Sequence, residues 1–126
     1  MQSREQAFAA VIHEQVKSYG DQNPLGSEAR QNYGSLAHKL PVLVRTAGLA
    51  QALEFVHSRG KSPHQQLLTH LAGVVVGADA GELLRRSRAE DLRNSIFLTE
   101  RTMLALKWYK RFAQSVLKVE PAEEEA

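Results

Sequence analysis

Apolar residues recur at three- and four-residue spacings along most of the chain, which is typical of α-helices that bury one face. The first such stripe follows Ser3 and Gln6, a pair spaced as in a capping box. A turn-rich segment over 20–26 then interrupts the pattern. The pattern predicts helices over about 3–19, 27–40, 49–60, 62–78, 82–86 and 87–117.

Three local signals set the expected ends of these helices. Pro41 lacks an amide donor and crowds the preceding turn, so it predicts an end or a kink in the second helix. Ser62 and Pro63 are expected to be the N-cap and the first residue of the fourth helix. Ser87 and Glu90 have the capping-box spacing and predict the start of the last helix. Together these signals divide the chain into helices joined by short turns.

Glycines stand at every fourth position at Gly73, Gly77 and Gly81. The three valines between the first two would suit a buried strand, but no other segment offers a strand partner. A helix is therefore predicted, with the glycines permitting close approach of a neighbouring helix. The segment lacks the Lys-Ser/Thr pair that follows a P-loop, so a glycine-rich phosphate loop is not expected.

The last predicted helix has one apolar face and one cationic face. At about 100° per residue, an apolar arc contains Ala105, Tyr109, Phe112 and Val116. The opposite side carries Lys107, Arg111, Gln114 and Lys118, with Lys110 at its edge. One face is therefore expected to join the core and the other to be available to phosphate. This arrangement favours a binding protein over an enzyme.

Length and composition predict one globular domain. The chain has 126 residues, of which 43% are hydrophobic and 24% charged, as in ordinary soluble proteins. We expect an all-α, compact single-domain bundle of about five to seven helices over 1–118, followed by a disordered acidic tail over 119–126. Removing the four glutamates of the last seven residues changes the formal net charge from +2 to +6. That basic body suggests a polyanionic partner, although a solvated basic surface is the alternative.

Several functional classes are not expected from this sequence. It contains no cysteine, which excludes disulfides and thiolate chemistry. No two of the five histidines lie four residues apart, so neither a metal nor another cofactor is predicted. The start of the chain has no apolar signal segment, and the longest apolar run, 67–80, is too short to cross a bilayer. A cytoplasmic location without membrane contact is therefore expected. No catalytic residue is predicted, because the acidic candidates flank helix starts and stabilise the helix dipole there: Asp79, Glu82, Glu90 and Asp91.

Lysines and arginines near helix ends and in the last helix are the remaining candidates for a binding site. They are Lys39, Arg45, Arg59, Lys61, Arg85, Arg86, Arg88, Lys107, Lys110 and Arg111. Cations spaced in this way could line a groove that follows a sugar–phosphate backbone. They could equally be solvated helix faces, and the residue types alone leave both interpretations open.

Three stretches of the sequence resemble a known family. They are residues 5–9 (EQAFA), 33–55 (YGSLAHKLPVLVRTAGLAQALEF) and 106–113 (LKWYKRFA), of which the second is the most specific. They resemble the small, fifth-numbered subunit of the Cmr complex, the type III-B CRISPR RNA-guided effector ribonucleoprotein, and they follow that family's order along most of the chain. One departure is Tyr109, where the family usually has an aliphatic residue, and both side chains suit a core position.

The resemblance implies an all-helical, non-catalytic protein that lines up in several copies along the complex. Its partners would be the backbone subunit that carries the guide RNA, other Cmr subunits and further copies of itself. Its basic faces would form part of the channel that holds the guide RNA–target RNA duplex. In that family RNA cleavage belongs to the backbone subunit, and sequence recognition is delegated to base pairing, as in other guided effectors.

The residues predicted to contact the target-strand backbone are Lys39, Arg45, Lys107, Lys110 and Arg111, which all lie within the matched stretches. Lys61 and Arg86 are added on local charge alone. The alternative is a helical adaptor that bridges protein subunits and never touches RNA. A stand-alone DNA-binding regulator is less favoured, because no helix-turn-helix with a polar recognition helix is visible.

Overall fold

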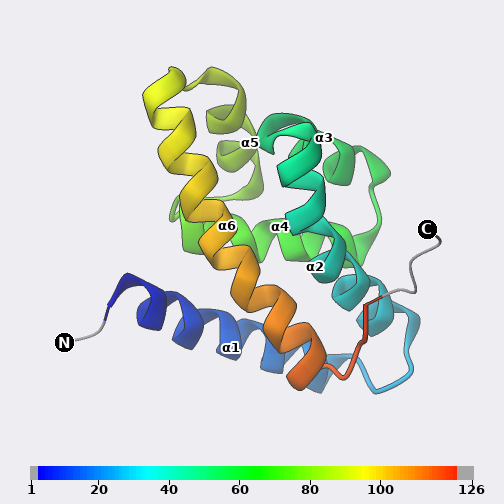
Figure 1. Ribbon diagram of the computed structural model, residues 1–126. Helices are drawn as coiled ribbons and strands as arrows, with labels where there is room; N and C mark the ends of the chain where they lie inside the picture. Colours follow the sequence, from blue (N-terminus) through cyan, green and yellow to red (C-terminus); the bar gives the residue numbers. More distant parts are fainter. Residues whose placement is uncertain (1–2, 122–126) are drawn as a thin grey trace.

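The computed structural model describes residues 3–121, and all regular secondary structure in that range is helical (Figure 1). The predicted all-α class is confirmed, and the six helices of this range agree with the expected five to seven. The helices are α1 (Arg4–Gln22), α2 (Glu28–Ala47), α3 (Leu49–Arg59), α4 (Ser62–Val75), α5 (Ala80–Ala89) and α6 (Leu92–Ser115).

Helix α4 lies at the centre of the molecule. It contacts each of the other five helices, whereas α6 packs mainly against α2 and α1. Figure 1 shows α6 running diagonally across α4 and α1, so that it holds both in place. The core therefore forms one continuous cluster, to which α4 contributes Leu67, Leu68, Leu71, Ala72 and Val75.

Within residues 3–121, no helix taken alone is long and apolar enough to cross a membrane. Helices α4 and α5 satisfy the length and hydropathy criteria only together, across a bend of 68°. The apolar face of α4 is buried against the other helices.

A hydrogen-bonded network crosses the core and joins four helices. The hydroxyl of Tyr33 lies 2.8 Å from Nδ1 of His70, and Gln66 lies 3.0 Å from the other ring nitrogen. Gln15 donates to the backbone oxygen of His70 and accepts from the hydroxyl of Tyr109. Burial lowers the pKa of His70 and raises those of Tyr33 and Tyr109, so all three side chains are neutral near pH 7.

The helix starts agree with the predictions at two places and differ at two others. The capping box of Ser3 and Gln6 is confirmed, with bonds of 2.8 and 3.1 Å. The expected capping box of Ser87 and Glu90 is wrong, because the Ser87 hydroxyl donates to the Leu84 oxygen inside α5. Asp91 caps α6 instead.

The start of α4 and the cap of α2 complete this comparison. The N-cap of α4 is Lys61, so Ser62 and Pro63 are its first two residues, and the helix begins one position earlier than predicted. Ser27 caps α2 through the Arg30 amide, as expected from the helix predicted to begin there.

The predicted end or kink at Pro41 is wrong, because α2 continues from Glu28 to Ala47. Proline inside a helix costs about 3 kcal/mol, since one backbone hydrogen bond is lost and the ring crowds the preceding turn. Pro41 is itself buried, and Leu40 and Val44 are buried on either side of it. The packing of this face holds the helix together across the proline.

The glycines at every fourth position do not mediate helix packing as predicted. Helix α4 ends at Val75, and Gly77 has a φ of +65° in the turn that follows. A Cβ added to Gly73 would meet no atom within 4 Å. The close approach occurs at Gly34 instead, where an added Cβ would lie 2.5 Å from the Cβ of Val119.

The chain stays packed just beyond α6. Val119 is buried, and its backbone oxygen lies 2.8 Å from Nε2 of His38. The predicted tail over 119–126 therefore begins at least one residue too early, while its last five residues lie outside the described part of the chain.

Arg30 joins the C-terminal ends of α1 and α6, a role that the sequence analysis did not anticipate. Its guanidinium donates to the backbone oxygens of Gly20 and Asn23 at the end of α1, at 3.1 Å each. It also donates to Val116 and Leu117 after α6, at 3.3 and 2.9 Å. Carbonyls at a helix end have no partner within their own helix, so one cation satisfies two helix ends.

We expect His70→Gln to weaken the pH dependence of folding. Because burial lowers the pKa of His70 from 6.5, acid favours the unfolded chain, in which the imidazole protonates more readily. The free energy of unfolding should therefore fall as the pH decreases below about 6.5, by up to about 1.4 kcal/mol per pH unit. Urea denaturation between about pH 7.5 and 5.5 measures this slope. His64 should supply the slope that remains, since its pKa is lowered too.

His57 is exposed and serves as the control. His57→Gln should leave the slope of the natural chain unchanged, and an unaltered slope in His70→Gln would contradict the assignment.

Two glycine-to-alanine changes inside helices should have opposite effects. Gly34→Ala should destabilise the fold by about 1–3 kcal/mol, because its methyl group would overlap Val119. Gly73→Ala should stabilise it by about 0.5–1 kcal/mol, because the added methyl group meets open space in a helix. Thermal denaturation measures both, and a stabilised Gly34→Ala would show that Val119 does not pack as described.

Candidate nucleic-acid interface

A groove between α2 and α6 brings together four of the predicted contact residues. Arg45 of α2 faces Lys107, Lys110 and Arg111 of α6 across a hollow of about 410 Å³. Pro41, Met103 and Gln114 complete its lining. We call this hollow the α2–α6 groove.

The two faces of α6 explain why the cations lie in the groove. Ala105, Tyr109 and Ala113 are fully buried, which confirms most of the predicted apolar arc. Lys107, Lys110, Arg111 and Gln114 are exposed on the other side, as expected. Phe112 and Val116 lie at the boundary and are partly buried.

The cations of this groove differ in how far neighbouring charges compensate them. Nζ of Lys107 lies 2.9 Å from a carboxylate oxygen of Glu5 in α1. The Lys107 side chain remains 54% exposed, so the pair is weak and its cation is accessible. Within residues 3–121, Arg45, Lys110 and Arg111 form no ion pair. The groove therefore has a net positive charge.

Two other predicted residues lie in a second groove. Lys39 and Lys61 line a hollow of about 380 Å³ between α2, α3 and the start of α4, which we call the α3–α4 groove. Its full lining is Asn32, Ser35, Leu36, Lys39, Leu43, Phe55, Val56, Arg59, Lys61 and His64. Lys39 and Arg45 are six residues apart in α2, which directs them about 120° apart around the helix axis. The expectation that all the cations share one face is therefore wrong.

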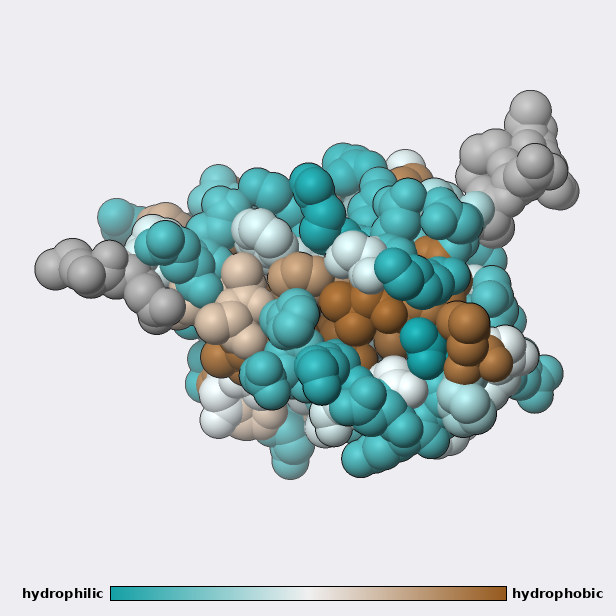
Figure 2. Space-filling view, turned by 90° about the horizontal axis from the view of Figure 1, so that it is seen from below, coloured by the Kyte–Doolittle hydropathy of each residue, from teal (hydrophilic) through white to brown (hydrophobic). Residues whose placement is uncertain are grey.

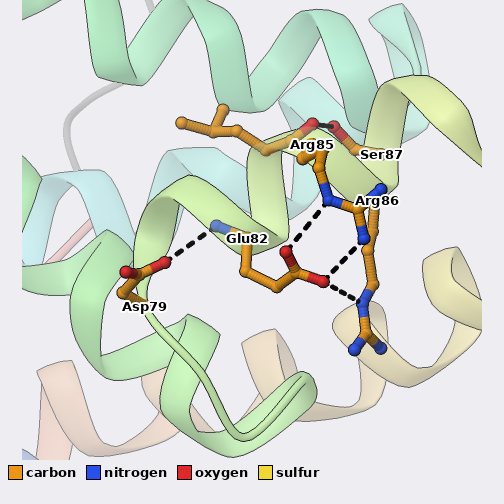
Figure 3. A network of polar contacts seen from close by, with 6 residues as sticks. Asp79, Glu82, Arg85, Arg86 and Ser87 are labelled. Carbon is orange, nitrogen blue, oxygen red and sulfur yellow. Dashed lines mark hydrogen bonds and ion pairs between the residues drawn. The ribbon is translucent and has the colours of Figure 1, made fainter.

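Arg86 lies apart from both grooves and is bound to a carboxylate. Its Nε donates to Glu82 at 2.8 Å, while Arg85 donates to the same carboxylate at 3.0 and 2.7 Å (Figure 3). These hydrogen bonds lower the pKa of Glu82 to about 2, with the Arg85 bond as the largest cause. Asp79 accepts from the Glu82 amide and caps α5. The charge of Arg86 is thus largely compensated.

Acidic residues form neither a metal site nor a pair poised for acid–base chemistry at the helix starts. Within residues 3–121, no three His, Cys, Asp or Glu side chains are placed to hold a metal ion. Asp79 and Asp91 accept hydrogen bonds from backbone amides as N-caps. This agrees with the dipole-stabilising role predicted for them.

The sequence analysis passed over two members of the α3–α4 groove. Arg59 was considered only as a neighbour of Gly60, and His64 was treated as a scattered surface histidine. His64 is partly buried, and its pKa is lowered by burial and by the charges of Arg59, Lys61 and Lys39. The turn at Gly60, with a φ of +70°, links the two lysine- and arginine-bearing ends and was the available signal.

The family model of the CRISPR-associated protein Cas_Cmr5 matches residues 4–116 of this chain. The chain belongs to the Cmr5 family. A curated relative, the CRISPR system Cmr subunit Cmr5 of Thermus thermophilus, is 41% identical over 117 residues, which cover 93% of this chain and 98% of the relative. The crystal structure of a CRISPR-associated Cmr5 family protein from Thermus thermophilus has a TM-score of 0.82 and 42% identity, over 92% of this chain and 98% of that one.

Membership of the Cmr5 family agrees with the resemblance noted from the three sequence stretches. Two of them build the α2–α6 groove, since residues 33–55 include the second half of α2 and residues 106–113 lie in α6. Tyr109, the departure from the family pattern, is fully buried as expected. Its hydroxyl is satisfied by Gln15 of α1, which makes the polar atom compatible with the core.

We expect the carboxyl group of Glu82 to titrate far below an ordinary glutamate. Carbon-detected NMR should give a pKa of about 2 instead of 4.5, because two guanidinium groups stabilise the ionised form. Arg85→Gln and Arg86→Gln should each raise this pKa. Lys17→Gln, which removes a cation paired with Asp21, should not change it. A Glu82 pKa near 4.5 in the natural chain would contradict the network.

Proposed function

We propose that this Cmr5-family chain is a non-catalytic small subunit of a type III-B CRISPR Cmr effector complex in the cytoplasm, where it serves in antiviral defence. It stacks in several copies beside the backbone subunit that carries the guide RNA, and it contacts target RNA through its basic surface. Membership of the family supports the assembly. The uncompensated cations of the α2–α6 groove support the RNA contact.

The contact in this proposal is to phosphate and not to bases. Arg45, Lys110 and Arg111 are exposed and unpaired within residues 3–121, so they can replace counterions along a sugar–phosphate backbone. One groove makes few such contacts and binds weakly. Several copies along one strand share the same ligand, which raises the overall affinity.

The remaining predicted residues have different weights in the proposal. Lys39 and Lys61 would meet the strand from the α3–α4 groove, because they too are unpaired in the described chain. Arg86 contributes least, because Glu82 already holds its guanidinium.

Contacts with other subunits require surface that the fold leaves uncovered. At the start of α6, Leu92, Ile96 and Phe97 are 78%, 50% and 57% exposed. Figure 2, seen from the side on which α1 lies, shows an apolar band framed by hydrophilic residues. On α1 and the following turn, the large exposed apolar side chains are Val11 and Leu25. Apolar surface of this kind is typical of protein–protein contacts.

A protein-bridging adaptor without RNA contact is the second candidate, and the ion pair of Lys107 with Glu5 favours it. The pair demonstrates that a carboxylate fits beside this cationic face, as an acidic patch of a neighbouring subunit would. Photocrosslinking of assembled complexes to RNA that carries a photoreactive base separates the two candidates. Labelling of this subunit is expected, whereas an adaptor would stay unlabelled.

Reversing two charges of the α2–α6 groove should weaken RNA binding by the assembled complex. We expect Lys107→Glu with Arg111→Glu to reduce affinity at least about tenfold at low salt, because attraction to phosphate is replaced by repulsion. The slope of log affinity against log salt should become shallower by about one for each phosphate that the variant no longer neutralises. Filter binding at several salt concentrations measures both quantities.

The matched control reverses two cations that line none of the cationic grooves. Lys17→Glu with Arg88→Glu changes the net charge equally and breaks only exposed ion pairs. It should leave the salt slope unchanged. If the groove variant kept the natural slope, or if both variants reduced it equally, the α2–α6 groove would not be the RNA contact.

A further inference from the structure

The α3–α4 groove combines positive charge with exposed aromatic surface. Its cations come from three segments: Lys39 from α2, Arg59 from the end of α3 and Lys61 from the N-cap of α4. No Asp or Glu is among its lining residues. Its volume of about 380 Å³ falls in the range of small-molecule sites, about 300–1,000 Å³. The groove is suited to an anion that also has a flat apolar part.

Phe55 provides the surface for that flat part. Its side chain is 49% exposed, although it is a large apolar residue. The guanidinium of Arg59 lies 5.4 Å from the centre of the Phe55 ring, so two planar groups stand together at the groove. Aromatic rings and guanidinium planes are the surfaces on which unpaired nucleobases stack.

The three cations converge on one place and are not compensated by neighbouring carboxylates. Within residues 3–121, Lys39, Arg59 and Lys61 form no ion pair. Their charges act together on His64, whose pKa is lowered first by burial and then by Arg59, Lys61 and Lys39. The first turn of α4 contains no acidic residue, so nothing there opposes the binding of phosphate.

We propose that the α3–α4 groove binds one nucleoside phosphate unit, with its phosphate among Lys39, Arg59 and Lys61 and its unstacked base on the ring of Phe55. Asn32 and Ser35 line the same groove and offer amide and hydroxyl groups to the ribose or the base edge. The inference goes beyond the proposed function and is independent of the α2–α6 groove. A free mononucleotide and an unpaired nucleotide of a single strand present the same chemistry.

Titration of the isolated ¹⁵N-labelled chain tests the site by NMR. Adenosine 5′-monophosphate should bind at least about tenfold more tightly than adenosine or inorganic phosphate, because only it engages both the cations and the ring. Its signals should map to residues 55–65. Phe55→Ala should reduce its affinity to that of inorganic phosphate and leave phosphate binding unchanged. Lys61→Gln should weaken both ligands, whereas the matched control Lys110→Gln, in the other groove, should affect neither.

Competition distinguishes the two sources of the nucleotide. A single-stranded adenylate hexamer should displace the mononucleotide if the site takes an unpaired nucleotide of a strand, and a blunt RNA duplex of equal length should not. Displacement by neither RNA assigns the site to free nucleotides. Equal displacement by the duplex would overturn the proposal, as would equal affinities for the mononucleotide and inorganic phosphate, or undiminished mononucleotide binding by a folded Phe55→Ala chain.

Discussion

The packing of the buried face of α6 is the constraint on which the rest of the structure depends. Ala105 and Ala113 are small, and Tyr109 between them is fully buried with its hydroxyl bonded to α1. A helix turns by about 100° per residue, so burying these positions directs Lys107 and Arg111 away from the core. Docking of α6 against α1 and α2 then places Glu5 and Arg45 beside those cations.

Neighbouring groups sort the cations of this chain into structural and available ones. The guanidinium of Arg30 is engaged with backbone oxygens at two helix ends, and Arg86 is held by Glu82. By contrast, Arg45, Lys110 and Arg111 have no carboxylate partner in the described chain. A net charge counts all of these residues equally, although only the second group retains the electrostatic potential that attracts a polyanion.

Helical periodicity predicted the six helices well, because one apolar stripe per helix is enough to report a buried face. The failures arose where packing outweighed a local signal. Pro41 lies inside α2 because its surroundings are buried, and Ser87 lies inside α5 because Asp91 provides the cap of α6. The spacing of Gly73 and Gly77 resembled a packing motif, yet one glycine faces solvent and the other forms a turn with positive φ.

The sequence by itself determined the helical class, the family, and the side of α6 on which each lysine and arginine lies, because these follow from local periodicity and residue identity. Only the tertiary structure decided which cations share a groove and which are compensated. Lys107 meets Glu5 across 102 positions of the chain, and Lys39 is separated from Arg45 although only six residues divide them. Such proximities depend on how rigid helices dock against one another, and that information is spread over the whole core and absent from any one segment.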